Sequence, residues 1–279
     1  MNFLLAYIKL LRPLNVFISA MVVVLSSAVL GVLNETDVVI HVVMVVSCYT
    51  GAANALNDMV DYKIDLINCP ERPIPSGLVS KKAALIISIF LFSFGTYFCL
   101  ELSQNSKVIG IGIAMPLMVL YSKSLKGIPL IGNITVAFIL GLAFLFCGAA
   151  FNYMSVMLVP TVLAFGLTLV REIVKDIADI DGDKSAGINT FPIFAGIKKT
   201  IQLIIFFSIC IGVGTFIPFI IGYYNLFYGI IVVLGVEIPL CIVVFSLLKN
   251  PGINTAKYCA RLLKFSTIIG LIAIYIGTL

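Results

Sequence analysis

Two groups of aspartates in this sequence have the same internal spacing and lie 118 positions apart. The first group is Asp58, Asp61 and Asp65, and the second group is Asp176, Asp179 and Asp183. Residues three and seven positions apart share one face of an α-helix, so each group is expected to gather its carboxylates there. No neighbouring residue is expected to neutralise them, which makes a divalent cation the expected partner. Oxygen ligands of this kind favour Mg²⁺, which commonly shares its coordination sphere with phosphate oxygens.

Basic residues flank both groups. They are Arg72 in the stretch 72–77, Lys123 and Lys126 after Tyr121, and Arg171 and Lys175 beside the second group. Metal-bridging carboxylates combined with Arg and Lys are typical of a diphosphate site. A single aspartate at a helix end would more simply be solvated, and Asp181, which breaks the spacing, is interpreted in that way. Proline and glycine in 70–77 and 182–192 predict turns rather than further helix.

The elements that must position these residues are membrane-spanning helices. The chain is 61% hydrophobic and only 11% charged, against about 25% charged in a soluble domain. Its apolar residues form continuous runs, which predict helices rather than a barrel. Nine runs are long enough to be read as spans, and they cover residues 13–33, 38–57, 82–102, 107–121, 130–150, 156–174, 198–221, 226–248 and 260–279. The predicted fold is therefore an all-α polytopic membrane protein.

The basic residues predict an orientation for these spans. Of the 18 lysines and arginines, all but Lys107 fall on one face of the nine-span arrangement. The positive-inside rule makes that face cytoplasmic, together with the N-terminus. The longest cytoplasmic stretches, 58–81 and 175–199, carry the aspartates, so the active site is expected on the cytoplasmic side of the cell membrane. Basic loops of this kind face anionic lipid headgroups, and no pattern indicates nucleic acid as a partner.

The offset of 118 residues also bears on domain organisation. It separates the ends of two spans that lie four spans apart, and an even number of spans returns the chain to the same face. The sequence therefore predicts a single domain, residues 1–279, that contains an internal four-helix repeat.

At these residues the chain resembles the UbiA-type superfamily of intramembrane prenyltransferases. The Asn-Asp-x-x-Asp-x-x-x-Asp motif of that family matches Asn57 to Asp65, and its second motif matches Asp179 and Asp183. The stretches 72–77 and 187–192 are also similar, and the resemblance covers nearly the whole chain. It implies nine helices around a central cavity with cytoplasmic cap loops. It also implies bound Mg²⁺, a polyprenyl diphosphate donor, and a cavity open to lipid for the prenyl tail.

The resemblance implies a role for each candidate residue. The expected metal ligands are Asn57, Asp61, Asp65, Asp179 and Asp183, with Asp58 and Asp176 completing or orienting the shell. Tyr121 is expected to face the developing allylic cation, whose charge an aromatic ring favours. The expected substrate-binding residues are Arg12, Asn15, Asn54, Asn57, Arg72, Lys123, Lys126, Arg171 and Lys175. Among them, Arg12 is expected to hold the phosphate of the acceptor.

Three short stretches bear on the acceptor. The runs 11–15, 121–126 and 171–176 are most similar to the branch of the superfamily that makes archaeal ether lipids. That branch joins geranylgeranyl diphosphate to geranylgeranylglyceryl phosphate, a lipid-phosphate acceptor. The alternative is an aromatic acceptor, as in quinone or haem biosynthesis.

Two other classes of membrane protein share some of these sequence features. The repeat and the intramembrane Glu237 are compatible with a cation-coupled transporter, although transporter carboxylates sit near the membrane midplane whereas these aspartates lie at span ends. A CDP-alcohol phosphotransferase would require a contiguous Asp-Gly-x-x-Ala-Arg signature, which this sequence lacks. Glu237 itself is either functional or a neutral side chain bonded to backbone that is freed by Pro239.

Overall fold

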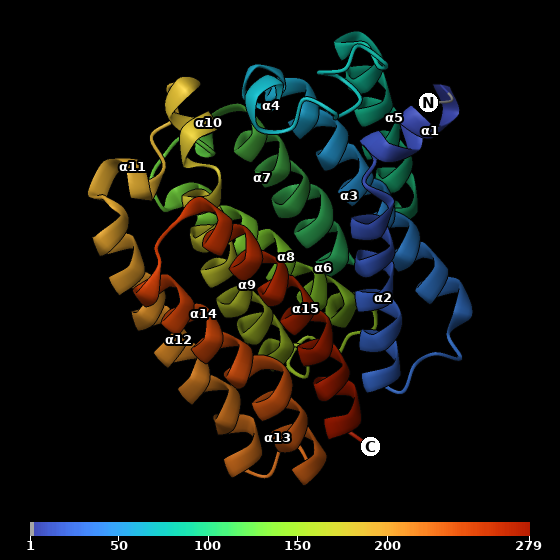
Figure 1. Cartoon of the computed structure of the whole chain (residues 1–279). Coiled ribbons are helices and arrows are strands. Elements are labelled where there is room, and N and C mark those ends of the chain that lie inside the picture. Colours follow the sequence, from blue (N-terminus) through green and yellow to red (C-terminus); the bar gives the residue numbers. More distant parts are fainter. Residues whose placement is uncertain (1–2) are drawn as a thin grey trace. The chain divides into compact units, whose positions relative to one another are not determined.

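The computed structural model describes residues 3–279, and all regular secondary structure in these residues is helical. Figure 1 shows the elements, three of which (η1–η3) are wider π-helical turns. The elements from the N-terminus to α8 are α1 (Phe3–Leu10), α2 (Pro13–Val29), α3 (Thr36–Val60), α4 (Tyr62–Asn68), α5 (Lys81–Leu100), α6 (Gln104–Lys107), η1 (Val108–Ala114), α7 (Met115–Leu120), η2 (Tyr121–Leu125) and α8 (Ile131–Ala150). The remaining elements are α9 (Leu158–Ala178), α10 (Ile180–Ser185), α11 (Phe191–Ala195), α12 (Ile197–Ile220), α13 (Leu226–Val232), η3 (Val233–Glu237), α14 (Ile238–Lys249) and α15 (Ile253–Gly277).

Seven helical segments within residues 3–279 are long and apolar enough to cross a membrane. They are Thr36–Val60, Lys81–Leu100, Gln104–Leu125, Ile131–Ala150, Ile197–Ile220, Leu226–Lys249 and Ile253–Gly277. An eighth span would be formed by α1 and α2 together, which are bent by 51°. The chain is therefore a multi-pass, all-helical membrane protein, and the prediction of nine spans stays a prediction.

The predicted span 156–174 corresponds to α9, which is not among these segments, and its composition explains why it differs from the others. This helix is long enough to cross, but it carries Arg171, Glu172, Lys175 and Asp176 near its C-terminal end. Charged side chains at the centre of a bilayer are costly. The buried face of α9 instead packs against α12 and α15.

The chain divides into two compact units. Unit 1 comprises residues 1–125, 142–156 and 181–187, and unit 2 comprises residues 126–141, 157–180 and 188–279. Helix α8 therefore contributes its first half to unit 2 and its second half to unit 1. The segment 181–187, which carries Asp183, belongs to unit 1 although it follows α9 in the chain.

Unit 1 is organised by the packing of α3 against α2 and α5 (Figure 1). The Tyr49 ring meets the Phe92 ring edge-on with centroids 5.6 Å apart, and the Ser88 hydroxyl donates to the Ala52 carbonyl at 2.9 Å. Gly95 lies directly against the Tyr49 ring, which lets α5 approach α3 closely. This packing fixes the end of α3, where the first aspartate group begins.

Unit 2 is organised by α9, which packs against both α12 and α15. The start of α13 is tied to the end of α15, because the Asn225 side-chain amide donates to the Ile276 carbonyl at 2.9 Å. The Tyr228 hydroxyl donates to the Thr215 carbonyl of α12 at 2.9 Å. These contacts join α13 to α12 and α15, the two helices that pack against α9.

The sequence spacing predicted that each aspartate group lies on one uninterrupted helix. The structure shows that neither group does. Helix α3 ends at Val60 and α4 begins at Tyr62, and Asp61 between them has a ψ of 4°. Helix α9 ends at Ala178, and Asp179, with a ψ of 5°, precedes α10. A ψ near 0° departs from the helical value of about −42° and turns the chain. Each group is thus divided between two helices at its middle aspartate.

The turn predictions were partly right. Residues 70–77 form turns as predicted, whereas residues 182–185 continue α10 in helical conformation. Glycine and serine are tolerated there because α10 is a short helix whose conformation is set by its packing rather than by intrinsic propensity.

The close approach of α3 and α5 can be tested at Gly95. A Cβ at Gly95 would lie 2.8 Å from Cδ1 of Tyr49, so Gly95→Ala should lower the free energy of unfolding by about 1–3 kcal/mol through overpacking. Gly112→Ala is the control, because a Cβ there meets no atom within 4 Å and removes backbone freedom from the unfolded chain. Thermal unfolding in detergent should show a fall for the first variant and none for the second. Equal shifts would contradict the proposed packing.

Candidate active site

The first aspartate group begins with Asp58, which is 2% exposed on the last turn of α3. The Arg12 guanidinium donates a hydrogen bond to its carboxylate. A second guanidinium, that of Arg72, lies 3.5 Å from the same carboxylate oxygen. A buried carboxylate is costly without a partner, and these two arginines provide Asp58 with its partners.

Arg12 reaches Asp58 from a strained backbone position. It has a φ of 52°, in the left-handed region, which costs a non-glycine residue roughly 1–2 kcal/mol. Pro13, the first residue of α2, also disfavours a helical conformation at the residue before it. The Asn54 amide of α3 donates to the Leu11 carbonyl at 3.0 Å and holds this turn in place. Strain of this kind is typical of functional positions.

Arg72 forms a bifurcated hydrogen bond with the carboxylate of Asp65 on α4. One guanidinium nitrogen lies 2.7 Å from each carboxylate oxygen of Asp65. Burial raises the pKa of the Asp65 carboxyl, and the Arg72 guanidinium offsets part of that rise. Burial lowers the pKa of Arg72, but the charges of Asp58 and Asp65 outweigh it and raise that pKa above its ordinary value.

The expectation that nothing nearby neutralises the aspartates was therefore wrong for the first group. Arg72 lies only seven residues beyond Asp65, and the turns of 70–77 fold it back onto the end of α4. Arg12 is 46 residues from Asp58 in the sequence, so its contact depends on α2 packing against α3.

Asp61 lies at the break between α3 and α4 and is 3% exposed. The Asn57 amide nitrogen donates to its carboxylate at 2.7 Å. The Asn57 carbonyl oxygen, Oδ1, is buried and has no hydrogen-bond partner among residues 3–279. A buried acceptor without a donor is unfavourable, and a cation beside Asp61 would satisfy it. The residues present thus fit a Mg²⁺ ion.

Asp183 is brought into unit 1 by helix α10 and is 5% exposed. Its neighbour Gly182 packs directly on α4, because a Cβ there would lie 2.0 Å from the Asn68 amide nitrogen. Only a residue without a side chain allows this approach. The last aspartate of the second group therefore belongs to the same compact unit as all three aspartates of the first.

The other two aspartates of the second group lie in unit 2. Asp176 accepts a hydrogen bond from the Asn133 amide of α8 at 2.9 Å. The ammonium of Lys175 lies 3.7 Å from Asp179 and 3.9 Å from Glu172. Lys175, expected to bind substrate, therefore also links two carboxylates along α9.

The Arg171 guanidinium has one nitrogen that forms a hydrogen bond and one that lacks an acceptor among the described residues. One of its terminal nitrogens donates to Glu172 at 2.5 Å. Its Nε is buried and has no hydrogen-bond partner in the described part of the chain. An unpaired guanidinium N–H is a suitable donor to a phosphate oxygen.

The remaining predicted site residues lie on η2, on α2 and in the turn before α8. Tyr121 and Lys123 belong to η2, which packs against α3 in unit 1. Asn15 is on the first turn of α2, and Lys126 is assigned to unit 2. In residues 3–279 no three carboxylate, imidazole or thiol side chains converge to hold a metal ion by themselves. Mg²⁺ usually keeps several waters and uses substrate phosphates, so it needs few protein ligands.

Two residues of the site were missed by the sequence reasoning. Glu172 pairs with Arg171 and Lys175, and its spacing of three residues from Lys175 could have indicated that pair. Asn133 bonds Asp176, and the signal for it was the repeat, because Asn133 lies 118 positions after Asn15.

The intramembrane Glu237 belongs to unit 2 and to neither aspartate group. Its carboxylate accepts a hydrogen bond from the Thr215 hydroxyl at 2.6 Å. Gly212 leaves room for it, since a Cβ there would lie 2.9 Å from Glu237 Oε2. These contacts link α12 to η3 and give Glu237 a structural role in helix packing.

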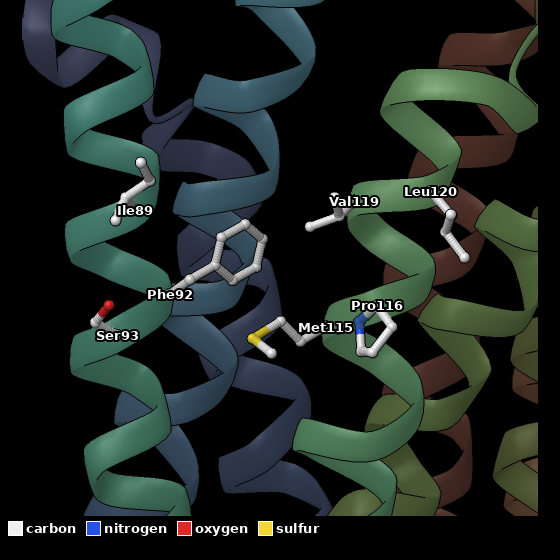
Figure 2. A pocket seen from close by; sticks show the side chains of 7 residues that line it. All are labelled: Ile89, Phe92, Ser93, Met115, Pro116, Val119 and Leu120. Carbon is white, nitrogen blue, oxygen red and sulfur yellow. The ribbon is translucent and has the colours of Figure 1, made fainter.

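An apolar groove lies between α5 and α7 of unit 1 (Figure 2). Its volume is about 480 Å³, within the range of about 300–1,000 Å³ for small-molecule sites. The lining residues are Ile89, Phe92, Ser93, Met115, Pro116, Val119 and Leu120. Leu120 is followed directly by Tyr121, so the α7 wall of the groove is joined in the chain to η2, which carries candidate site residues.

Sequence comparison identifies the class of protein that this arrangement represents. Residues 16–268 match the UbiA prenyltransferase family. A digeranylgeranylglyceryl phosphate synthase from Thermococcus gammatolerans is 35% identical over 275 residues, covering 98% of each chain. The corresponding synthase from Methanobrevibacter smithii is 36% identical, covering 98% of this chain and 97% of the relative.

Structural comparison agrees. A structure described as giving insight into digeranylgeranylglyceryl phosphate synthase in membranes has a TM-score of 0.80 and 28% identity, covering 100% of this chain and 99% of the other. A UbiA homologue from Archaeoglobus fulgidus bound to DMAPP and Mg²⁺ has a TM-score of 0.71 at 17% identity, covering 96% and 98%. The chain belongs to the UbiA prenyltransferase family. It is a membrane-embedded prenyltransferase that is similar to digeranylgeranylglyceryl phosphate synthases.

The contact between α10 and α4 can be tested with a pair of substitutions. Gly182→Ala should force Asn68 aside and displace Asp183, lowering prenyl transfer by about tenfold or more, because small misplacements of catalytic groups are costly. Adding Asn68→Ala removes the obstructing amide and should restore most of the activity. Transfer rates of both variants and of Asn68→Ala alone would show the coupling. Additive effects without rescue would mean that the two residues do not pack together.

Proposed function

We propose that this enzyme transfers a geranylgeranyl group from geranylgeranyl diphosphate to the hydroxyl of geranylgeranylglyceryl phosphate, with Mg²⁺ as the cofactor. The relatives named above, which the chain matches over nearly its full length, support this acceptor. The Mg²⁺ and DMAPP in the structure of the A. fulgidus homologue support the metal and the class of donor. The reaction belongs to archaeal ether-lipid synthesis.

One structural observation carries the proposal. Helix α10 lies with α3 and α4 in one compact unit, and Gly182 packs on Asn68. Asp183 therefore shares that unit with Asp58, Asp61 and Asp65, although more than 100 residues separate them in sequence. Buried carboxylates within one compact unit need a counter-charge, and a bound cation can supply it.

The carboxylates and one amide would form the metal site. The proposed ligands are Asn57, Asp61, Asp65, Asp179 and Asp183, and Asp58 and Asp176 orient the surrounding shell. When bound, Mg²⁺ neutralises negative charge on the leaving diphosphate. Arg72 already bridges Asp58 and Asp65, so it can hold the ligands in place and present a further N–H to a diphosphate oxygen.

Further basic residues would bind the rest of the diphosphate. The buried Nε of Arg171, which has no hydrogen-bond partner in the described residues, supports a role for Arg171 in binding the diphosphate. We propose that Lys123, Lys126 and Lys175 bind the diphosphate together with Arg171. As the bond between C1 and the bridging oxygen breaks, the ring of Tyr121 stabilises the developing allylic cation. The acceptor hydroxyl forms the new ether bond, and its proton and the diphosphate are released. Arg12, Asn15 and Asn54 are proposed to bind the acceptor end of the site, with Arg12 facing its phosphate.

The apolar groove between α5 and α7 is proposed to hold the prenyl chain of the donor. Its wall α7 ends at Leu120 and is followed directly by Tyr121. Its other wall, Ile89 to Ser93, begins eight residues after Lys81, about 12 Å along α5 at 1.5 Å per residue. A chain anchored by its diphosphate near the end of α3 would therefore reach the groove after its first isoprene units. Met115 gives the groove an adaptable lining.

We further propose the topology that the sequence indicated. The bent pair α1–α2 and helix α9 complete nine spans around a central cavity, with cap loops and N-terminus on the cytoplasmic side. The distribution of Lys and Arg supports this orientation. The charged end of α9 would then lie at the cytoplasmic surface of the cell membrane, where its charges are less costly.

The metal site is tested by substitutions at one aspartate from each group. Asp61→Asn and Asp183→Asn remove one charge each at nearly constant volume and should reduce Mg²⁺-dependent transfer by at least about 100-fold. Asp181→Asn is a matched control, since Asp181 is exposed and lies outside the spacing. The measurement is transfer of labelled geranylgeranyl groups to geranylgeranylglyceryl phosphate or to 4-hydroxybenzoate in detergent. Wild-type transfer only to the aromatic acceptor would overturn the proposed acceptor, and full activity of both variants would overturn the metal site.

The groove is tested by filling it. Ser93→Trp should reduce kcat/KM for geranylgeranyl diphosphate by about tenfold, as expected when a pocket loses room for part of a substrate. Dimethylallyl diphosphate, which is too short to reach Ser93, should be used as well as by wild type. Ile209→Trp, on the exposed surface of α12, controls for an added lipid-facing tryptophan. Equal losses with both donors would argue against a chain-binding role.

A further inference from the structure

The offset of 118 residues also relates the backbone at the start of two helices. Arg12 and Leu130, 118 positions apart, both adopt left-handed conformations, with φ of 52° and 64°. Each directly precedes the first residue of a helix, α2 in one case and α8 in the other. The carbonyls of Arg12 and Leu130 accept from the amides of Val16 and Ile134, again 118 positions apart, at 3.2 and 2.8 Å.

The same offset relates the helices that follow. Helix α3 ends at Val60 and α9 ends at Ala178. At the next residue the amides of Asp61 and Asp179 donate back to the fourth preceding carbonyl. Asp58 and Asp176 are therefore equivalent positions, each two residues before the end of its helix.

In each repeat a side chain from the beginning of the preceding helix reaches this equivalent aspartate. In the first repeat it is the Arg12 guanidinium that donates to Asp58. In the second repeat the position of Arg12 is taken by Leu130, which cannot donate. There the Asn133 amide, three residues further on, donates to Asp176 at 2.9 Å. Asn133 is 7% exposed, so its amide is committed to the interior.

We infer that Asn133 is the positioning residue of the second aspartate group, fixing the Asp176 carboxylate as Arg12 fixes that of Asp58. The two hydrogen-bond donors differ in charge. The guanidinium adds a positive charge beside Asp58, whereas the amide fixes the orientation of Asp176 without adding one. Outer-shell hydrogen bonds of this kind typically change metal affinity by about 10–100-fold. This inference rests on the proposed function, because it takes Asp176 as part of the Mg²⁺–diphosphate site.

The experiment measures metal binding directly, in the full-length protein in detergent. Mn²⁺ serves as the probe, and its binding in the presence of pyrophosphate is followed by electron paramagnetic resonance. Asn133→Ala should weaken Mn²⁺ binding by about tenfold or more and raise the Mg²⁺ concentration for half-maximal transfer by a similar factor. Asn133→Gln keeps a neutral amide donor and should recover part of the affinity.

Thr135→Val is the matched control for stability. Thr135 lies on the same turn of α8 and is 7% exposed, but its hydroxyl donates only to the Ile131 carbonyl of its own helix. This variant should lose stability without losing Mn²⁺ affinity. Unchanged Mn²⁺ affinity in Asn133→Ala, or equal losses in Asn133→Ala and Thr135→Val, would overturn the inference. A wild-type protein that binds no Mn²⁺ with pyrophosphate would instead overturn the proposed function.

Discussion

Buried carboxylates need a counter-charge, and this requirement organises the candidate site. Asp58, Asp61, Asp65 and Asp183 are all nearly inaccessible to water, where unpaired charges are poorly screened. The protein meets part of the requirement with Arg12 and Arg72. Removing one partner of such a group would leave an uncompensated charge, which is why breaking a buried pair is more costly than never forming it. The rest of the requirement is left for a cation and its substrate.

The two aspartate groups meet the same requirement in different ways. The first group is neutralised by guanidinium groups, one of which comes from a strained left-handed residue. The second group combines a lysine that spans two carboxylates with a neutral amide from α8. The two aspartate groups therefore have unequal sets of partners.

Buried polar atoms without partners carry further information about the ligand. The Asn57 Oδ1 acceptor and the Arg171 Nε donor are both buried and unsatisfied in residues 3–279. An acceptor of this kind suits a cation, and a guanidinium donor suits an anion. Their chemistry matches that of a metal diphosphate, whereas a transported cation alone would satisfy only the acceptor. Glu237, the residue that favoured a transporter, is bonded to Thr215 within the helix packing of unit 2.

The sequence by itself determined the aspartate spacing, the apolar runs and the 118-residue offset, because local composition and periodicity report helices and repeats directly. It also led to the family through contiguous motifs. Tertiary structure decided which residues neutralise Asp58, that α10 joins unit 1, and that Asn133 meets Asp176. Arg12 and Asp58 are 46 residues apart, and Asn133 and Asp176 are 43 apart. Such contacts depend on how neighbouring helices pack, and no local pattern encodes that packing.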